Sequence, residues 1–371
     1  GLGDVYKRQV KKYIFWGAGT HGRLAVEKFG QNHTTDESLT GFIDKNQTGE
    51  FCGYPILTEQ EIHKDTEVLV ITVDKTEFVA EIYEQAKKSG YKKVYWFTSV
   101  KQKKTGKFLL DYCVNCKTWG DLVLSQAEIH VVDYCNLNCR GCAHYSPIFK
   151  KELPDRESRI NDIRKLKDKF SHIIKFFLMG GEPFLNPDII SYIEETRKIL
   201  PDTMIQIVTN GLLIPKLSQE VWKAIYENRI VISISEYEPT HSMINRIKDI
   251  LEEHDVAYIL RPYESKTKFI KPLSLIPDSK YEKECISNGC INIWNGQIAR
   301  CPNLMYINRF NEAFQTALPN QGIYELDSLD GREIIRLMKE AVPLCDYCIH
   351  NEISWGSCGN HPTLYDFAEE D

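Results

Sequence analysis

Three cysteines stand close together near the middle of this chain. Cys135, Cys139 and Cys142 have the spacing C-x3-C-x2-C and directly follow an alternating apolar stretch, 129–134. Soft sulfur ligands select zinc and iron–sulfur clusters. Three thiolates on one loop can hold three corners of a [4Fe–4S] cube and leave the fourth iron open, whereas a structural zinc site usually takes four ligands. The spacing therefore favours a cluster with an open iron, and zinc is the alternative.

A second motif, Phe177–Pro183, follows about forty residues later and ends in Gly-Gly-Glu-Pro. Together the two motifs resemble the radical S-adenosylmethionine (SAM) enzyme superfamily. One departure is Gly141, because the residue before the third cysteine is usually aromatic in this superfamily. His144 and Tyr145 are the candidates to supply the ring instead.

The resemblance implies that the three cysteines hold a [4Fe–4S] cluster whose open iron binds SAM. It implies that Glu182 accepts a hydrogen bond from the SAM ammonium group. Residues 209–211 and 233–235 match places where the superfamily contacts SAM. An ordinary turn is the alternative role for the first of these segments, and an ordinary strand face for the second. Reductive cleavage of SAM would give a 5′-deoxyadenosyl radical that abstracts hydrogen from the substrate. The residues expected to contact SAM are Gly180, Gly181, Glu182, Pro183, Thr209, Asn210, Ser233 and Ser235.

The elements that must position these motifs alternate between strands and helices. Such alternation predicts an α/β fold with a parallel sheet covered by helices. The resemblance implies a partial (β/α)6 radical SAM barrel over residues 125–275, with its active site at the carboxyl ends of the strands. Strands are predicted at 128–133, 173–179, 204–209, 229–235 and 256–260, and helices at 157–170, 187–199, 216–227 and 241–253.

More cysteines lie in the last part of the chain, 276–371. Gly296 stands between two of them in a short hairpin pattern, and a C-x2-C pair follows much later. This arrangement resembles the SPASM/twitch extension, which implies one auxiliary [4Fe–4S] cluster used for electron transfer. Cys290 is the alternative first ligand, and a four-cysteine zinc knuckle is the alternative site. The expected ligands are Cys285, Cys301, Cys345 and Cys348.

The segment 10–100 predicts a small α/β domain of its own. A strand, the turn Gly17-Ala-Gly19-Thr-His-Gly22 and a helix follow one another, and Asp44 ends the next strand. In this context the glycines permit a tight turn, the helix N-terminus faces a phosphate, and a carboxylate can meet a ribose hydroxyl. The segment resembles the N-terminal Rossmann-like domain of sugar O-acyltransferases and nucleotide-sugar epimerases. That resemblance implies a nucleotide or nucleotide-sugar ligand, and a docking role is the alternative.

Two further segments complete the organisation. Residues 101–124 are expected to form a linker, in which Cys113 and Cys116 are interpreted as structural or spare thiols. A C-x2-C pair is otherwise half of a metal site. The first nine residues resemble translated sequencing-adaptor sequence and are expected to lie outside the folded domains.

Composition narrows the class of protein. The chain has 371 residues, 42% of them hydrophobic, and a net charge of −6 with acidic and basic residues interspersed. Nucleic acid is therefore not an expected partner. No apolar stretch reaches the roughly 18 residues that cross a bilayer, so we expect no membrane span and a cytoplasmic protein. Twelve cysteines without a secretory leader then favour metal or redox use over disulfides.

These observations predict a radical SAM oxidoreductase with a small-molecule substrate. The sugar-pathway resemblance favours oxidation or epimerisation of a sugar, cyclitol or nucleotide sugar, and flavodoxin or ferredoxin is the expected electron donor. A peptide-modifying maturase and a non-catalytic iron–sulfur sensor that binds SAM are the alternatives. No side chain is singled out as the proton acceptor.

Overall fold

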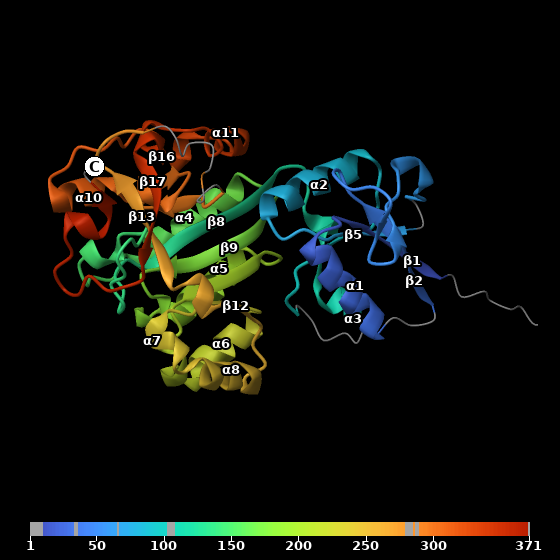
Figure 1. Ribbon diagram of the computed structural model, residues 1–371, viewed down its shortest axis with the longest axis horizontal. Helices are drawn as coiled ribbons and strands as arrows, with labels where there is room; N and C mark the ends of the chain where they lie inside the picture. Colours follow the sequence, from blue (N-terminus) through green and yellow to red (C-terminus); the bar gives the residue numbers. More distant parts are fainter. Residues whose placement is uncertain are drawn as a thin grey trace, which may run out of the picture. The chain divides into compact units, whose positions relative to one another are not determined.

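The computed structural model describes residues 10–32, 36–64, 67–101, 108–278, 285 and 289–369. It divides into two compact units, Gly1–Ser125 and Gln126–Asp371 (Figure 1). The expectation for residues 1–9 lies outside the described residues. Within the described part of the chain, no helix is both long and apolar enough to cross a membrane.

The first unit is built on a five-stranded sheet in the order β2-β1-β5-β6-β7. Neighbouring strands from β2 to β6 run parallel, and β7 runs antiparallel to β6. The inner strands are short apolar runs with buried side chains, which suits a sheet covered on both faces. The elements are β1 (Lys11–Trp16), α1 (Thr20–Asn32), β2 (Glu37–Ile43), β3 (Glu50–Phe51), β4 (Tyr54–Pro55), β5 (Glu67–Ile71), α2 (Thr76–Lys88), β6 (Val94–Phe97), α3 (Phe108–Asp111) and β7 (Cys113–Asn115).

Part of the segment expected to be a linker is instead structured. Strand β7 closes one edge of the first sheet by pairing with β6, and Cys113 and Cys116 lie buried in this unit. The physical reason is that the edge of a sheet presents unpaired backbone groups, which even a three-residue strand can pair with. The predicted residues 102–107 of that linker lie outside the described residues.

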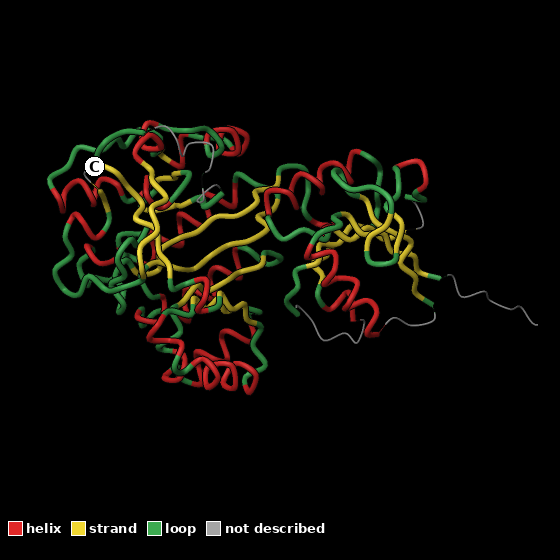
Figure 2. Tube along the Cα trace, in the orientation of Figure 1, coloured by secondary structure: helices red, strands yellow, loops and turns green. Residues whose placement is uncertain are grey.

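The second unit is built on an eight-stranded sheet in the order β12-β11-β10-β9-β8-β14-β15-β16. The pairs β9–β10, β10–β11, β11–β12 and β8–β14 are parallel. Strands alternate with helices along this unit (Figure 2). The predicted parallel sheet is confirmed, while the partial barrel stays a prediction. The first elements are β8 (Val123–Val132), α4 (Arg156–Asp168), β9 (His172–Gly180), α5 (Ile189–Ile199), β10 (Met204–Thr209), α6 (Gln219–Glu227), β11 (Val231–Ser235), α7 (Glu238–His241), α8 (Ile244–Glu253) and β12 (Tyr258–Arg261).

Local signals account for where these helices begin. The side chain of Asp155 accepts a hydrogen bond from Glu157 N at the start of α4, and Ser218 Oγ accepts one from Val221 N at the start of α6. Such capping satisfies amides that a helix leaves without partners. Apolar side chains of β9 such as Ile174 and Phe176 are fully buried.

The last part of the chain adds a small sheet, β17-β13-β18, and a separate apolar cluster. Strand β13 runs antiparallel to β17 and parallel to β18. The cluster includes Tyr145, three residues after Cys142, and Phe310 and Phe367 from later in the chain. The elements are β13 (Lys268–Ser274), β14 (Asn292–Trp294), β15 (Gln297–Ala299), α9 (Pro302–Met305), α10 (Ile307–Phe314), β16 (Tyr324–Glu325), α11 (Gly331–Leu337), β17 (Cys348–Ser354) and β18 (Ala368–Glu369).

Candidate functional site

The three-cysteine loop begins directly after strand β8, at its carboxyl end. The Cys142 thiol is among the groups that raise the pKa of both Cys135 and Cys139, so the three sulfurs lie within electrostatic range of one another. Burial is the main cause in each case, and it raises the pKa of Cys135 to about 12. A bound metal reverses this rise in pKa, because a thiol that coordinates a metal is deprotonated. Without one, the three thiols stay protonated.

The sulfurs of Cys135 and Cys139 each accept a hydrogen bond from an N–H donor. Leu137 N donates to Cys135 Sγ at 3.5 Å, and the Trp355 indole Nε1 donates to Cys139 Sγ at 3.2 Å. Burial raises the pKa of Cys142, and hydrogen bonds from backbone amides that follow it in the loop oppose that rise. Donors aimed at sulfur stabilise a thiolate. The donor set therefore fits a cluster held by these three cysteines.

The backbone of the loop explains the glycine at position 141. Gly141 has a φ of +65°, and a Cβ there would lie 2.6 Å from Ile270 O of strand β13. An aromatic residue at this position is thus excluded by the chain itself. Both sequence candidates for the missing ring are packed elsewhere, with Tyr145 against Phe310 at a ring distance of 5.0 Å and His144 against His130 at 5.0 Å.

The segment after β17 pairs with the cysteine loop, which the sequence did not reveal. Arg140 N donates to Gly356 O at 2.8 Å, and Cys358 N donates to Asn138 O at 2.9 Å. The Arg140 guanidinium lies 3.0 Å from the Asp366 carboxylate. These contacts fix a loop that contains two residues with positive φ, Asn138 and Gly141.

The Gly-Gly-Glu-Pro motif packs directly against the chain that leads into the loop. A Cβ on Gly180 would meet Val132 O at 1.9 Å, and one on Gly181 would meet Tyr134 O at the same distance. Pro183 begins the short turn that follows. Only glycine fits where two backbones approach this closely.

Glu182 ties the ends of β9 and β10 together. Its Oε1 accepts hydrogen bonds from Thr209 Oγ1 at 2.8 Å and from Phe184 N at 3.2 Å, and its Oε2 accepts one from Asn210 N at 2.9 Å. Burial raises the pKa of Glu182 to about 7, and these three hydrogen bonds oppose the rise. A carboxylate has about four acceptor positions. The side chain is 0% exposed, and its contact with a SAM ammonium stays a prediction.

Asn210 connects this strand end to the cysteine loop. Its Nδ2 donates to Asn136 Oδ1 at 2.7 Å and lies 3.8 Å from Cys135 Sγ. The structure therefore brings the predicted motif 209–211 to the first cysteine. The predicted serines Ser233 and Ser235 lie buried on the neighbouring strand β11, and their contacts with SAM stay predictions.

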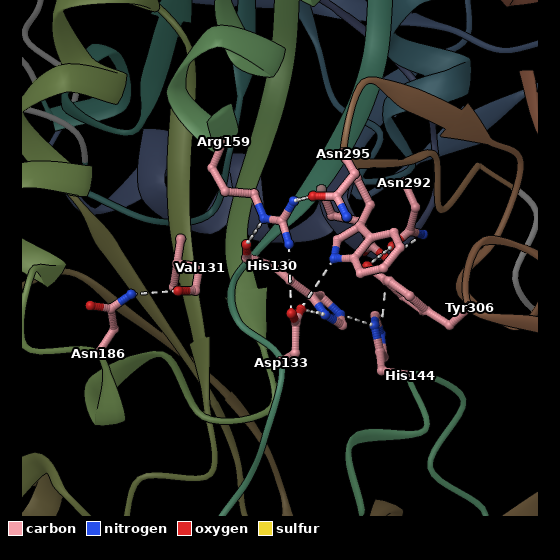
Figure 3. Close-up of polar contacts among 11 residues, drawn as sticks. His130, Val131, Asp133, His144, Arg159, Asn186, Asn292, Asn295 and Tyr306 are labelled. Carbon is pink, nitrogen blue, oxygen red and sulfur yellow. Dashed lines mark hydrogen bonds and ion pairs between the residues drawn. The ribbon is translucent and has the colours of Figure 1, made fainter. Parts of the chain in front are cut away.

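A buried polar network lies behind the loop, as Figure 3 shows. His130 Nδ1 is 3.0 Å from Asp133 Oδ1, and His130 Nε2 is 2.8 Å from His144 Nδ1. Burial lowers the pKa of His130, so the ring is neutral. A neutral ring that donates to Asp133 must accept from His144. The network thus holds His144, two residues after Cys142, against strand β8.

Other elements complete this network. Arg159 of α4 donates from Nε to His130 O at 3.2 Å and lies 3.6 Å from Asp133 Oδ2. The indole Nε1 of Trp294 also donates to Asp133, at 3.3 Å. On its own, burial would raise the pKa of Asp133, but hydrogen bonds from His130 and Trp294 and the charge of Arg159 oppose it, and the pKa is lowered. These residues belong to no recognisable sequence motif, so the network could not be predicted from the sequence.

The four cysteines predicted for an auxiliary cluster lie near one another. Burial raises the pKa of Cys301 to about 12, with Cys285 and Cys345 as further causes. Burial also raises the pKa of Cys348, with Cys301, Cys345 and Cys285 as further causes. Val342 N is 3.4 Å from Cys345 Sγ. Their role as ligands stays a prediction.

Ligands of a single metal ion would converge on one point. Among the described residues, no three His, Cys, Asp or Glu side chains do so. The thiolates of a cube each bind a different iron atom.

In the first unit, the predicted nucleotide-binding residues build a closed turn. Gly17 has a φ of +121°, and a Cβ on Gly22 would lie 2.3 Å from Gly17 O. Asp44 Oδ2 accepts a hydrogen bond from Ala18 N at 2.8 Å, and Oδ1 accepts one from Asn46 N at 2.9 Å. Gly19 has open space beside it. The Asp44 carboxylate thus holds the turn, and its contact with a ribose stays a prediction.

The cysteine pair of the first unit is buried. Burial raises the pKa of both Cys113 and Cys116, and Cys113 Sγ donates to Leu109 O at 3.2 Å. These thiols are therefore protonated parts of a packed core.

Part of the second unit is similar to a known protein family. Residues 129–264 match the model of the Radical SAM superfamily. Curated relatives include the GTP 3′,8-cyclases of Crocosphaera subtropica, 31% identical over 118 residues (30% of this chain, 34% of the relative), and of Alkaliphilus metalliredigens, 31% identical over 139 residues (37% and 41%). The chain thus spans less than half of the length of these relatives.

Similar solved structures include BtrN in complex with AdoMet and 2-DOIA, 15% identical with a TM-score of 0.40 over 62% of this chain and 94% of that one. Streptococcus suis SuiB bound to S-adenosylmethionine is 12% identical with a TM-score of 0.33 over 59% and 66%. The superfamily whose model residues 129–264 match implies SAM and a [4Fe–4S] cluster.

Proposed function

We propose that this protein is a radical SAM enzyme in which Cys135, Cys139 and Cys142 hold the cluster. A bound cluster supplies one electron that cleaves a sulfur–carbon bond of SAM, giving methionine and a 5′-deoxyadenosyl radical that takes a hydrogen atom from the substrate. The observation that carries the proposal is that N–H donors are directed at two sulfurs of the loop, those of Cys135 and Cys139. Hydrogen bonds to cluster sulfurs are a principal control of cluster chemistry.

The chain's own residues shape the SAM site at the carboxyl ends of the strands. Gly180 and Gly181 bring the backbone of β9 against the start of the loop. Glu182 joins β9 to β10, and Asn210 joins β10 to the first cysteine. With Pro183, Thr209, Ser233 and Ser235, these groups are the proposed contacts of SAM.

We further propose that Cys285, Cys301, Cys345 and Cys348 hold one auxiliary [4Fe–4S] cluster. The electrostatic effects of neighbouring thiols on Cys301 and Cys348 support it. Cys285 is among the causes that raise the pKa of both Cys301 and Cys348, and Cys290 stays the alternative first ligand. Four thiolates fill one cube, so its natural role is electron transfer rather than substrate binding.

The substrate proposed here is a sugar, cyclitol or nucleotide sugar that is oxidised or epimerised. The support is the resemblance of the first unit to domains of sugar-pathway enzymes, with its glycine turn and Asp44. We propose a nucleotide or nucleotide sugar as that unit's ligand. Flavodoxin or ferredoxin is the proposed donor of electrons.

A substrate-independent assay tests the central proposal. Anaerobically reconstituted protein is incubated with SAM and dithionite, and 5′-deoxyadenosine is measured by mass spectrometry. We expect the product from the unaltered chain and none from Cys139→Ala, whereas Cys113→Ala, which changes a buried thiol of the first unit, keeps it. A loaded protein that yields no 5′-deoxyadenosine with several reductants would be a sensor that only binds SAM.

A substrate screen then separates the enzyme classes. Nucleotide sugars, free sugars and cyclitols form one arm, and short peptides form the other. GTP belongs in the first arm because the curated relatives are named GTP 3′,8-cyclases. Turnover of a peptide alone would favour the maturase alternative.

A further inference from the structure

Trp355 lies outside every motif described above, yet its side chain meets a predicted cluster ligand. It directly follows strand β17, and its indole Nε1 donates a hydrogen bond to Cys139 Sγ at 3.2 Å. Cys139 is 8% exposed and the indole is partly buried. An N–H dipole acts more strongly on a charge in such a setting than in water.

Several contacts hold the indole in this position. Trp355 N donates to Thr267 O at 2.8 Å, and the ring stacks on Tyr237 with centroids 6.0 Å apart and an angle of 23°. Cys139 and Ser357 form a β-bridge two residues further on. The indole is therefore held in place by a backbone hydrogen bond, by ring stacking and by the β-bridge that follows it.

The sulfurs of Cys135 and Cys139 differ in the origin of their donors. At Cys135 one donor, Leu137 N, comes from the loop itself, and the side-chain amide of Asn210 lies 3.8 Å from the same sulfur. The donor at Cys139 comes from a side chain 216 positions away in the sequence. Unlike Asn210, which is also a proposed contact of SAM, Trp355 can be substituted without altering either the loop or a proposed SAM contact.

We propose that Trp355 is a positioning residue that raises the reduction potential of the cluster held by the loop, through its hydrogen bond to Cys139. Reduction adds one electron and hence one negative charge to the cluster and its thiolates. A donor aimed at a ligand sulfur stabilises the more negative state, so the potential rises. This inference rests on the proposed function, because it requires a cluster at Cys135, Cys139 and Cys142.

The test is a potentiometric titration of the full chain, followed by electron paramagnetic resonance, with Trp355→Phe. Phenylalanine keeps an aromatic ring against Tyr237 and removes the N–H. The loop cluster is identified as the signal that changes when SAM is added. We expect the ratio of reduced to oxidised cluster at a fixed potential to fall about tenfold, which is about 59 mV for a one-electron couple.

Trp222→Phe is the matched control. Trp222 is a buried indole on α6 that stacks on His254 at a centroid distance of 4.4 Å. Its substitution should leave the midpoint potential unchanged. Iron content and thermal unfolding of both variants show whether the cluster and the fold are retained.

A second measurement needs no variant. In wild-type protein carrying ¹⁵N in its indole rings, pulsed paramagnetic resonance of the SAM-sensitive signal should reveal one coupled nitrogen. An unchanged midpoint in an iron-loaded Trp355→Phe protein overturns the inference, and so does a wild-type signal without indole coupling. A wild-type chain that assembles no SAM-sensitive cluster overturns the proposed function instead.

Discussion

Glu128 is a buried carboxyl group whose replacement by glutamine should change how stability depends on pH. It lies on strand β8, 6% exposed, and its Oε1 accepts a hydrogen bond from Asn292 Nδ2 at 2.7 Å. Burial raises the pKa of Glu128 from 4.5 to about 7, against the opposing effects of Asn292 and Arg261. His144 lies 3.9 Å away, so this carboxyl touches the network behind the loop.

The sign follows from proton binding in the two states. Between pH 4.5 and 7 the unfolded chain has released this proton while the folded chain still holds it. Stability therefore falls as pH rises through this window and is level above it. Each pKa unit is worth about 1.4 kcal/mol. The full loss is about 3 kcal/mol, of which about 2 kcal/mol falls between pH 5.5 and pH 8.

Glutamine keeps an acceptor for Asn292 and has no proton to lose. We therefore expect the free energy of unfolding of Glu128→Gln, relative to wild type, to increase by about 2 kcal/mol from pH 5.5 to pH 8. Denaturant unfolding at the two pH values measures it, with both proteins in the same cluster state. Glu253→Gln on the exposed end of α8 is the control and should show no such difference. Parallel pH curves for wild type and Glu128→Gln would refute the reasoning.

Three further outcomes are expected. Cys135→Ala should lower the iron content by about four per chain, whereas Cys113→Ala should leave it unchanged, as colorimetric iron analysis would show. Gly181→Ala should destabilise the fold by about 1–3 kcal/mol, or displace the loop, because its Cβ would lie 1.9 Å from Tyr134 O, whereas Gly19→Ala meets open space; thermal unfolding compares them. Thr209→Val removes one of the donors to buried Glu182 and should cost about 1–3 kcal/mol in denaturant unfolding; an unchanged midpoint would contradict that role.

Local patterns were sufficient to predict the elements that carry the site. The strand predicted at 204–209 is β10, Met204–Thr209, and the helix predicted at 187–199 begins two residues later, at Ile189. Apolar periodicity and strand-end glycines are properties of neighbouring residues, so the sequence displays them directly. The same holds for the proximity of Gly180 to the loop, since parallel strands present their carboxyl ends at one edge.

Contacts between segments that are distant in the sequence could not be predicted, because no local pattern of residues indicates them. Asp44 has the position of a ribose-binding carboxylate, yet it accepts hydrogen bonds from the turn that it was expected to serve. Spacing alone cannot distinguish the two roles, because both need a carboxylate at the same strand end. The network around His130 was missed for a related reason. Its members come from β8, α4, β14 and the loop after Cys142, and each is an ordinary polar residue in its own segment.

Gly141 shows how a local departure from a family pattern has a distant cause. Read in the sequence, the glycine is a missing aromatic ring. In the structure the carbonyl of Ile270 occupies the place where a Cβ would lie. The position of strand β13 therefore requires glycine at 141. The same strand pairs with β17, and Trp355, the residue after β17, donates a hydrogen bond to Cys139. Strand β13 thus excludes an aromatic ring at Gly141, and its partner β17 leads to Trp355, which brings an aromatic ring to the loop. The residue types at positions 141 and 355 therefore have to be interpreted together.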